Sequence, residues 1–139
     1  MQDKKKAFVD SNIFLYLYSE DEKTKQDIAE KIITTGQPIV STQVINEISN
    51  VLHKKFHKSF STIQQILEEL LPYITVKPVD LSTIQNAFTL ADKYKYAYFD
   101  SLILSSALEQ HCEVLYSEDM RDQQIIEKKI KIINPFKGK

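Results

Sequence analysis

The sequence contains few of the residues on which several large classes of protein depend. It has only two glycines, Gly36 and Gly138, so it lacks the glycine-rich loops of dinucleotide-binding folds and P-loop enzymes. It has a single cysteine, Cys112, so no disulfide can form within the chain. No apolar run approaches the ~20 residues of a membrane-spanning helix, and no apolar run opens the chain. We therefore expect a cytoplasmic protein with no membrane segment.

Arginine and net charge are also scarce. The chain has one arginine, Arg121, and its 18 basic residues against 19 acidic ones leave a net charge of −1. A strongly basic surface for nucleic acid is therefore excluded, and any contact with phosphate depends on a local patch. Two segments supply candidate lysines: Lys54, Lys55 and Lys58 in the first, and Lys128, Lys129, Lys131, Lys137 and Lys139 in the second.

Hydrophobic periodicity predicts one domain, residues 1–139, in which strands and helices alternate. Short apolar runs predict strands over 7–9, 38–41, 73–76, 113–116 and 130–133. Helical spacing predicts a helix from residue 12 and further helices over 22–35, 43–56, 61–71, 80–94 and 100–110. This alternation indicates an α/β fold with a parallel sheet and right-handed crossovers.

Four carboxylates fall where such a sheet gathers ligands. In open α/β sheets, ligands bind beyond the carboxyl ends of the strands. Asp10 follows the first predicted strand directly, and Asp119 lies three residues after Tyr116. Glu47 is early in the helix after the second strand, and Asp100 heads the helix before the fourth. We therefore expect these acids at one edge of the sheet.

Each of these carboxylates also has an ordinary structural explanation. Asp10 and Asp100 suit helix caps, and Asp119 suits a solvated loop. Glu47 is harder to explain, because it lies inside its helix and no capping box accounts for it. Asp100, if helical, shares a face with apolar residues such as Ala107, where an unpaired carboxylate is costly. Because converging carboxylates repel one another, we interpret the four as a pocket for a hard divalent cation, Mg²⁺ or Mn²⁺.

Five segments resemble the motifs of PIN-domain nucleases. Residues 8–15, an apolar strand ending in Asp-x-Asn, resemble the first motif, and 41–47, a Ser/Thr-led helix bearing a glutamate, the second. Residues 100–107, Asp-x-Leu-Ile followed by small residues, resemble the third motif. Residues 115–120 resemble the fourth motif, and 132–136 resemble the usual ending. Each motif is weak by itself, but the five together, in this order over essentially the whole chain, are specific.

The subgroup that the sequence resembles most is the VapC-like toxins of bacterial and archaeal toxin–antitoxin pairs. The resemblance implies a PIN-like three-layer α/β/α sandwich around a short parallel sheet. It also implies Mg²⁺-dependent cleavage of RNA, a homodimer and a cognate antitoxin. Carried over by position, it implies that Asp10, Glu47 and Asp100 hold the principal metal ion. Asp119 would complete the acidic cluster, either directly, through water or at a second ion.

The same resemblance gives a supporting role to two neutral residues. Asn12 and Ser117 would orient the metal-binding carboxylates. The sequence departs from the family pattern at Ser11, where threonine is common, although the hydroxyl is kept. It departs again at Gln123, where relatives often have glycine, so we expect a different shape for the loop after Asp119.

Aromatic residues alternate with lysines just before Asp100. Tyr94, Tyr96 and Tyr98 alternate with Lys93 and Lys95, a mixture that can stack bases and attract phosphates. Packing of the tyrosines, with the lysines at the surface, explains the same pattern and is the interpretation we favour.

Three alternatives to a metal-dependent endoribonuclease stay open. A metal-independent ribonuclease would use histidines, with His53, His57 and His111 as candidates, although a solvated basic face explains the first two better. A catalytically inactive PIN-like module that binds protein or RNA would keep the same fold. The apolar face of the helix over 61–71 suits such a partner, or simply the core. A phospho-acceptor receiver domain fits poorly, because its first strand would end in a pair of acids.

Overall fold

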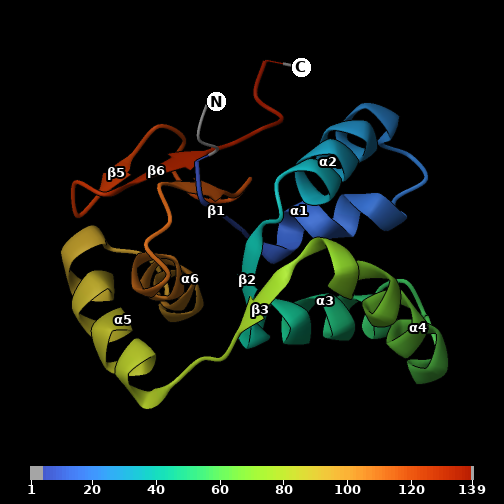
Figure 1. Cartoon of the computed structure of the whole chain (residues 1–139), viewed down its shortest axis with the longest axis horizontal. Coiled ribbons are helices and arrows are strands. Elements are labelled where there is room, and N and C mark those ends of the chain that lie inside the picture. The colour runs from blue at the N-terminus through green and yellow to red at the C-terminus, as the bar shows by residue number, and fades with distance from the viewer. Residues whose placement is uncertain (1–4, 139) are drawn as a thin grey trace.

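The computed structural model describes residues 5–138, which form a six-stranded sheet flanked by helices (Figure 1). The strands, in the order β3-β2-β1-β4-β6-β5, are parallel except for β5, which pairs antiparallel with β6. The predicted α/β class is confirmed, and β5 is an antiparallel edge strand that was not predicted. The strands are β1 (Ala7–Val9), β2 (Ile39–Ser41), β3 (Thr75–Lys77), β4 (Val114–Tyr116), β5 (Ile125–Ile126) and β6 (Ile130–Ile133).

Helices cover both sides of the central strands. Figure 1 shows α1 and α2 on one side and α5 and α6 on the other. No helix within residues 5–138 combines the length and apolar character needed to span a membrane. The helices are α1 (Ser11–Leu15), α2 (Lys23–Thr35), α3 (Thr42–Lys54), α4 (Phe60–Leu70), α5 (Leu81–Tyr94) and α6 (Tyr98–Glu109), with short 3-10 turns η1 (Tyr16–Tyr18) and η2 (Leu71–Tyr73).

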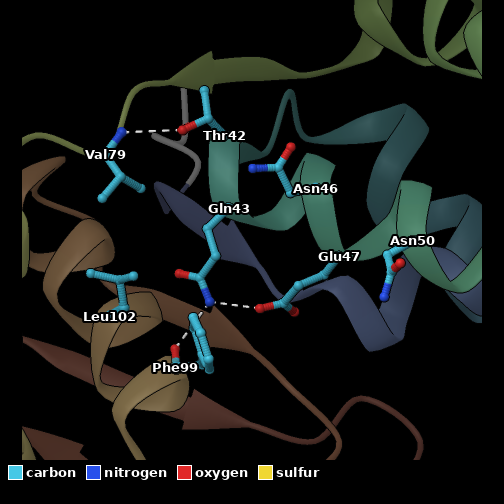
Figure 2. A pocket seen from close by; sticks show the side chains of 8 residues that line it. All are labelled: Thr42, Gln43, Asn46, Glu47, Asn50, Val79, Phe99 and Leu102. Atoms are coloured by element: carbon cyan, nitrogen blue, oxygen red, sulfur yellow. Dashed lines mark hydrogen bonds between the residues drawn. The ribbon is translucent and has the colours of Figure 1, made fainter.

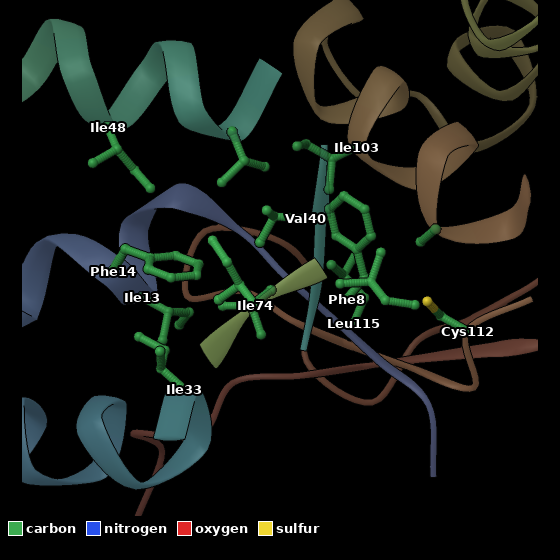
Figure 3. Close-up of a cluster of buried hydrophobic side chains, with 14 of the residues drawn as sticks. Phe8, Ile13, Phe14, Ile33, Val40, Ile48, Ile74, Ile103, Cys112 and Leu115 are labelled. Atoms are coloured by element: carbon green, nitrogen blue, oxygen red, sulfur yellow. The ribbon is translucent and has the colours of Figure 1, made fainter. Parts of the chain in front are cut away.

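The core lies on both faces of the sheet. Phe8 in β1 and Leu115 in β4 are fully buried, and Figure 3 shows them beside Ile103 of α6. Phe14 of α1 and Ile33 of α2 are also fully buried in the same cluster. Strands covered on both faces read as continuous apolar runs, which explains why the short segments of the sheet were recognisable in the sequence. With both faces covered, the strand ends are where polar side chains gather.

The helix α3 begins after a capping serine and packs its apolar stripe inward. The Ser41 hydroxyl accepts a hydrogen bond from the Val44 amide at 3.4 Å, and Ile48 and Leu52 are buried. Helix α4 begins in the same way, with Ser59 accepting from the Thr62 amide at 3.1 Å. The apolar face of α4 packs against α3, as the ordinary core interpretation predicted. The residues that meet between the two helices are Ile45, Ile48, Ser49, Leu52, Ile63, Ile66, Leu67 and Leu70.

The structure corrects two predicted helix ends. Helix α6 begins at Tyr98, with Ala97 as its N-cap, so Asp100 lies in the first turn and is not the cap. Helix α3 ends at Lys54, two residues earlier than predicted. The first difference matters for the site, because a carboxylate in the first turn of a helix is stabilised by the helix dipole without being used as a cap.

Candidate active site

The site lies between β1 and β4, at the point where the order of the strands in the sheet reverses. The chain leaves β1 toward β2 on one side of the sheet and leaves β4 toward β6 on the other. Such a switch point opens a crevice at the carboxyl ends of the two strands. The register pairs Val9 with Tyr116, so the next residues, Asp10 and Ser117, lie side by side. The Asp10 amide donates to the Tyr116 carbonyl at 3.0 Å, and the Ser117 hydroxyl donates to Asp10 Oδ2 at 2.9 Å.

Asp10 is a buried carboxyl group in this crevice. Its Oδ1 accepts a hydrogen bond from the Ser11 amide at 2.7 Å, so it also caps α1. Burial raises the pKa of Asp10 to about 7, although the hydrogen bonds from Ser117 and Ser11 act in the opposite direction. The nearby carboxylates of Glu47 and Asp100 raise it further. The helix-cap explanation is therefore confirmed for Asp10, but it does not account for the other acids that converge on it.

Glu47 reaches the same crevice from α3. The Ser11 hydroxyl donates to Glu47 Oε2 at 2.6 Å, and the Gln43 amide Nε2 donates to Oε1 at 2.6 Å. Gln43 Nε2 also lies 3.2 Å from the Phe99 carbonyl oxygen, so this one side chain connects α3 to the start of α6 (Figure 2). Gln43 was missed in the sequence. Its only signal was its position four residues before Glu47, on the same helix face.

Asp119 is held from the end of β1 by Asn12. The Asn12 amide Nδ2 donates to Asp119 Oδ2 at 3.1 Å and lies 3.5 Å from Asp10 Oδ2. Its carbonyl oxygen accepts from the backbone amide of Glu118 at 3.2 Å. Asn12 therefore bridges the chain after β1 and the loop after β4. This contact and the one from Ser117 place both predicted neutral residues against the carboxylates.

Asp100 completes the group from the first turn of α6. It is half-buried, and it has no side-chain hydrogen bond within residues 5–138. Burial raises the pKa of Asp100, and the carboxylates of Asp119 and Glu47 raise it further. The four predicted acids are thus electrostatically coupled, Asp10 to Glu47 and Asp100, and Asp100 to Asp119.

No cation of the described chain neutralises these four acids. The ion pairs between residues 5–138 involve other carboxylates, such as Glu118, whose Oε2 lies 2.6 Å from Lys25 Nζ. The groups that donate hydrogen bonds to these acids are all neutral. They are serine hydroxyls, the side-chain amides of an asparagine and a glutamine, and a backbone amide. Oxygen ligands with uncompensated negative charge are the donor set that a hard divalent cation requires.

The carboxylates do not form a ready-made metal cluster. Across residues 5–138, no three or more Asp, Glu, His or Cys side chains meet the arrangement that holds a metal ion. Ser11 and Gln43 each donate to one oxygen of Glu47, so each oxygen keeps a second lone pair that could contact a cation. The site is therefore compatible with a cation in its chemistry, but it is not preorganised around one.

The histidine candidates do not form a pair. Helix α3 ends at Lys54, and His57 lies beyond it in a left-handed backbone conformation (φ 58°), so His53 and His57 do not share a helix face. His53 Nδ1 lies 3.0 Å from the Lys58 carbonyl, and its ring stacks on Phe60 with centroids 4.1 Å apart. Both histidines are exposed, as the interpretation of this segment as a solvated basic face predicted.

The tyrosines before Asp100 divide into two kinds. The Tyr94 hydroxyl donates to Glu127 Oε2 at 2.7 Å, and the Tyr96 hydroxyl donates to Gln124 Oε1 at 2.6 Å. These two tyrosines fix the β5–β6 region, as the packing interpretation predicted. Tyr98 is different, because it is partly exposed and its ring lies 5.2 Å from that of the exposed Phe99.

Solved structures with the same fold include proteins of toxin–antitoxin systems. One chain of a toxin–antitoxin complex from Klebsiella pneumoniae is 21% identical, with a TM-score of 0.70 over 94% of this chain and 98% of that one. VapC20 of Mycobacterium tuberculosis, described as a Sarcin-Ricin loop cleaving toxin, is 14% identical, with a TM-score of 0.67 over 81% and 89% of the two chains. A chain of FitAB bound to an IR36 DNA fragment is 13% identical, with a TM-score of 0.57 over 93% and 94%. These identities are low, so the likeness shows the fold.

The sequence itself identifies the family. None of the curated proteins compared with the chain matches it. The family model for the PIN domain, in contrast, matches residues 7–128, which contain all four carboxylates of the site. The fold, a mostly parallel six-stranded sheet flanked by helices, is the PIN-like one that the solved structures share. The chain therefore belongs to the PIN-domain family.

Proposed function

We propose that this chain is a metal-dependent endoribonuclease that hydrolyses the phosphodiester bonds of RNA. Asp10, Glu47, Asp100 and Asp119 would be the ligands of a Mg²⁺ or Mn²⁺ ion. The observation that carries the proposal is the convergence of these four acids at the switch point with neutral donors and no basic partner among residues 5–138. The fold family adds to it, since a match to the PIN domain points to a nuclease.

The chain's own residues would position the carboxylates. Ser117 and the Ser11 amide hold the two oxygens of Asp10, and Asn12 holds Asp119. A bound divalent ion lowers the pKa of a water and stabilises negative charge on the phosphoryl oxygens. No nucleophilic side chain is required. Cys112 does not suit one, because it is buried and burial raises the pKa of its thiol to about 11.

We further propose that the chain is the toxin of a toxin–antitoxin pair, acting as a homodimer and held inactive by a cognate antitoxin. The support is structural similarity to a chain from a toxin–antitoxin complex, over nearly the whole length of both chains. RNA as the substrate is supported by the similarity to VapC20, which is described as cleaving the sarcin–ricin loop.

The proposal is tested by RNA cleavage with the purified chain, free of any antitoxin. Total RNA is incubated with Mg²⁺, with Mn²⁺ and with a chelator, beside an Asp10→Asn variant prepared in the same way. We expect cleavage by the wild-type chain alone, its loss in chelator, and products with 5′-phosphate ends. Asn keeps the size of Asp10 and one oxygen that can accept from the Ser11 amide, and the Ser117 hydroxyl can turn to accept from the new amide NH2, so the main change is the loss of charge.

Other outcomes would contradict the proposal in different ways. Equal cleavage by both proteins would indicate a contaminant. Cleavage in chelator with 2′,3′-cyclic phosphate ends would indicate metal-independent chemistry. If neither protein cuts total RNA, RNA crosslinked to the chain in cells is sequenced and the captured species is used as the substrate. Resistance of that species to cleavage would favour an inactive binding module.

A further inference from the structure

A cavity of about 460 Å³ adjoins the carboxylates, and the proposed hydrolysis gives it no role. Its walls come from α3, the start of α6 and the segment that leads into α5, and its eight lining residues are labelled in Figure 2. Glu47 belongs both to this cavity and to the acidic site. A molecule in the cavity would therefore lie directly beside the carboxylates. The volume is within the range of roughly 300–1,000 Å³ that binds small ligands.

The walls favour a flat, uncharged group. None of the eight lining residues is lysine or arginine, so the cavity is not built for phosphate. Apart from Glu47, the lining consists of apolar and neutral polar side chains. Phe99 is 63% exposed and lines the cavity together with Val79 and Leu102. An exposed aromatic ring at the edge of a nuclease site is a platform on which a base can stack.

The polar part of the wall consists of amides. Asn46 and Asn50 lie one helical turn apart on α3, and both side chains are exposed. Neither has a side-chain hydrogen bond to any of residues 5–138, so each offers a donor and an acceptor. Asparagine amides can pair with the donor and acceptor groups on the edge of a base. The cavity therefore combines a stacking surface with groups able to distinguish one base from another.

Gln43 connects this cavity to the acidic site. Its Nε2 donates to Glu47 and to the Phe99 carbonyl, which fixes the orientation of the amide. Its oxygen Oε1 is turned toward Leu102 in Figure 2, and it is buried without a hydrogen-bond partner within residues 5–138. A buried acceptor with no partner is rare, so the amide is held in this orientation by the two contacts of its nitrogen. On another wall of the cavity, the Thr42 hydroxyl at the start of α3 accepts a hydrogen bond from the Val79 amide at 3.2 Å and so connects α3 to the segment before α5.

We propose that this cavity binds an unpaired nucleobase of the RNA substrate, next to the phosphate that is cleaved. This inference rests on the proposed ribonuclease function. Phe99 stacks on the face of the base, and Asn46 and Asn50 determine which base is preferred. Gln43 is a positioning residue, because it sets the backbone of Phe99 relative to the Glu47 carboxylate. Selection of a base is thereby linked to the placement of the adjacent phosphate.

The first test measures binding without cleavage. The full chain carrying Asp100→Asn is titrated, with Mg²⁺ present, against short oligouridylates that carry A, C, G or U at one central position. We expect one base to be bound about 10-fold more tightly than the weakest. Adding Asn46→Ala or Phe99→Ala should reduce this ratio below about 2-fold. Asn86→Ala and Phe60→Ala are matched controls, since both side chains are exposed and lie outside the cavity, and they should keep the preference.

The second test separates this inference from the proposed function. The active chain cuts a randomised RNA, and the new ends are sequenced for the wild type and for Asn46→Ala. Cleavage with a base preference that is unchanged by Asn46→Ala would overturn the base pocket and leave the nuclease intact. Base-selective binding that depends on Asn46, with no cleavage, would leave the pocket and overturn the nuclease. Absence of any base preference in binding overturns the pocket in either case.

A protein contact is the competing use of the same surface. If Phe99→Ala converts a dimer to a monomer in sedimentation without altering the base preference, the cavity is an interface between copies of the chain and the inference is wrong. Should Phe99→Ala fail to fold, Asn46→Ala carries the test alone. Asn46 is an exposed polar residue on a long helix, so we expect that variant to keep the wild-type circular dichroism spectrum and melting temperature.

Discussion

Two groups of carboxylates in this molecule are treated in opposite ways. At the switch point, Asp10 and Asp100 lie among other acids and neutral donors, and burial raises the pKa of both. In the region around β5 and β6, Asp122 and Glu127 face lysines, and hydrogen bonds lower the pKa of both. Glu118 belongs to the second kind, because Lys25 engages it at 2.6 Å. Carboxylates are thus paired with lysines around β5 and β6 and at Glu118, and they are left without a cation at the switch point.

The difference indicates which acids serve the fold and which are available for a ligand. An ion pair satisfies a carboxylate and adds a little stability, so its residues need no other explanation. Converging carboxylates without a cation destabilise the protein that contains them, and such a cost is expected at functional sites. The comparison can be tested by removing charges from each group in turn.

The largest effect is expected for Asp100→Asn on RNA cleavage. Asparagine keeps the shape of the side chain and removes the charge of one proposed metal ligand, so we expect the cleavage rate to fall by at least about 100-fold. The measurement is the initial rate on labelled RNA with Mg²⁺ present. Asp122→Asn is the matched control from the paired group, and it should keep the rate within about twofold. Full activity of Asp100→Asn would show that it is not a ligand.

The outline of the acidic group could be predicted from the sequence, because it depends on strand ends. Asp10 follows an apolar strand directly, and that position alone places it at the edge of a parallel sheet. Glu47 was recognisable at the border of the apolar stripe of α3, and Asp100 was recognisable on the apolar helix α6. The alternation of strands and helices was equally visible, since the strands are buried on both faces.

The neutral donors and the absence of cations could not be predicted in this way. The contact between Asn12 and Asp119 joins residues 107 positions apart and depends on the register of β1 and β4. That Lys25 pairs with Glu118 and not with a site acid depends on the packing of α2, which sequence spacing does not reveal. Strand β5 has only two residues, which is too short for an alternation of apolar and polar residues to be recognised in the sequence. It is defined by its pairing with β6.

The second prediction concerns the free energy of unfolding in the absence of metal. Because Asp10 is a buried acid with no cation beside it, Asp10→Asn should stabilise the protein in chelator at pH 8, by about 2 kcal/mol. Urea unfolding followed by circular dichroism measures this difference. Adding Mg²⁺ should raise the stability of the wild type and leave that of Asp10→Asn nearly unchanged. If Asp10→Asn is less stable than the wild type in chelator, the carboxylate serves the fold and the comparison fails.

A smaller effect is expected for Lys25→Met, which removes a cation from the paired group. Lys25 Nζ contacts Glu118 at 2.6 Å and the Tyr16 hydroxyl at 3.2 Å, and it lies 5.4 Å from the centre of the Phe136 ring. We expect a loss of about 0.5–1 kcal/mol in the free energy of unfolding. Lys23→Met is the control, because its pair with Asp27 is largely exposed, and it should change stability less. Equal effects of the two variants would show that the Lys25 network adds nothing beyond an exposed pair.

The smallest effect is expected for Glu127→Gln, and it should depend on pH. The Glu127 carboxylate accepts hydrogen bonds from Lys93 Nζ at 2.6 Å and from the Tyr94 hydroxyl at 2.7 Å, and both contacts lower its pKa in the folded protein. A carboxyl group whose pKa is lower when folded stabilises the protein above its unfolded pKa of about 4.5, and this contribution is lost as the pH falls further.

The variant should therefore melt slightly below the wild type at pH 7, and the two melting temperatures should converge as the pH is lowered toward 3. Glu68→Gln is the matched control, since Glu68 is exposed on α4 and has no ion pair within residues 5–138. A difference between Glu127→Gln and the wild type that stays constant with pH would arise from packing. In that case the contrast between paired and uncompensated acids would not extend to this end of the sheet.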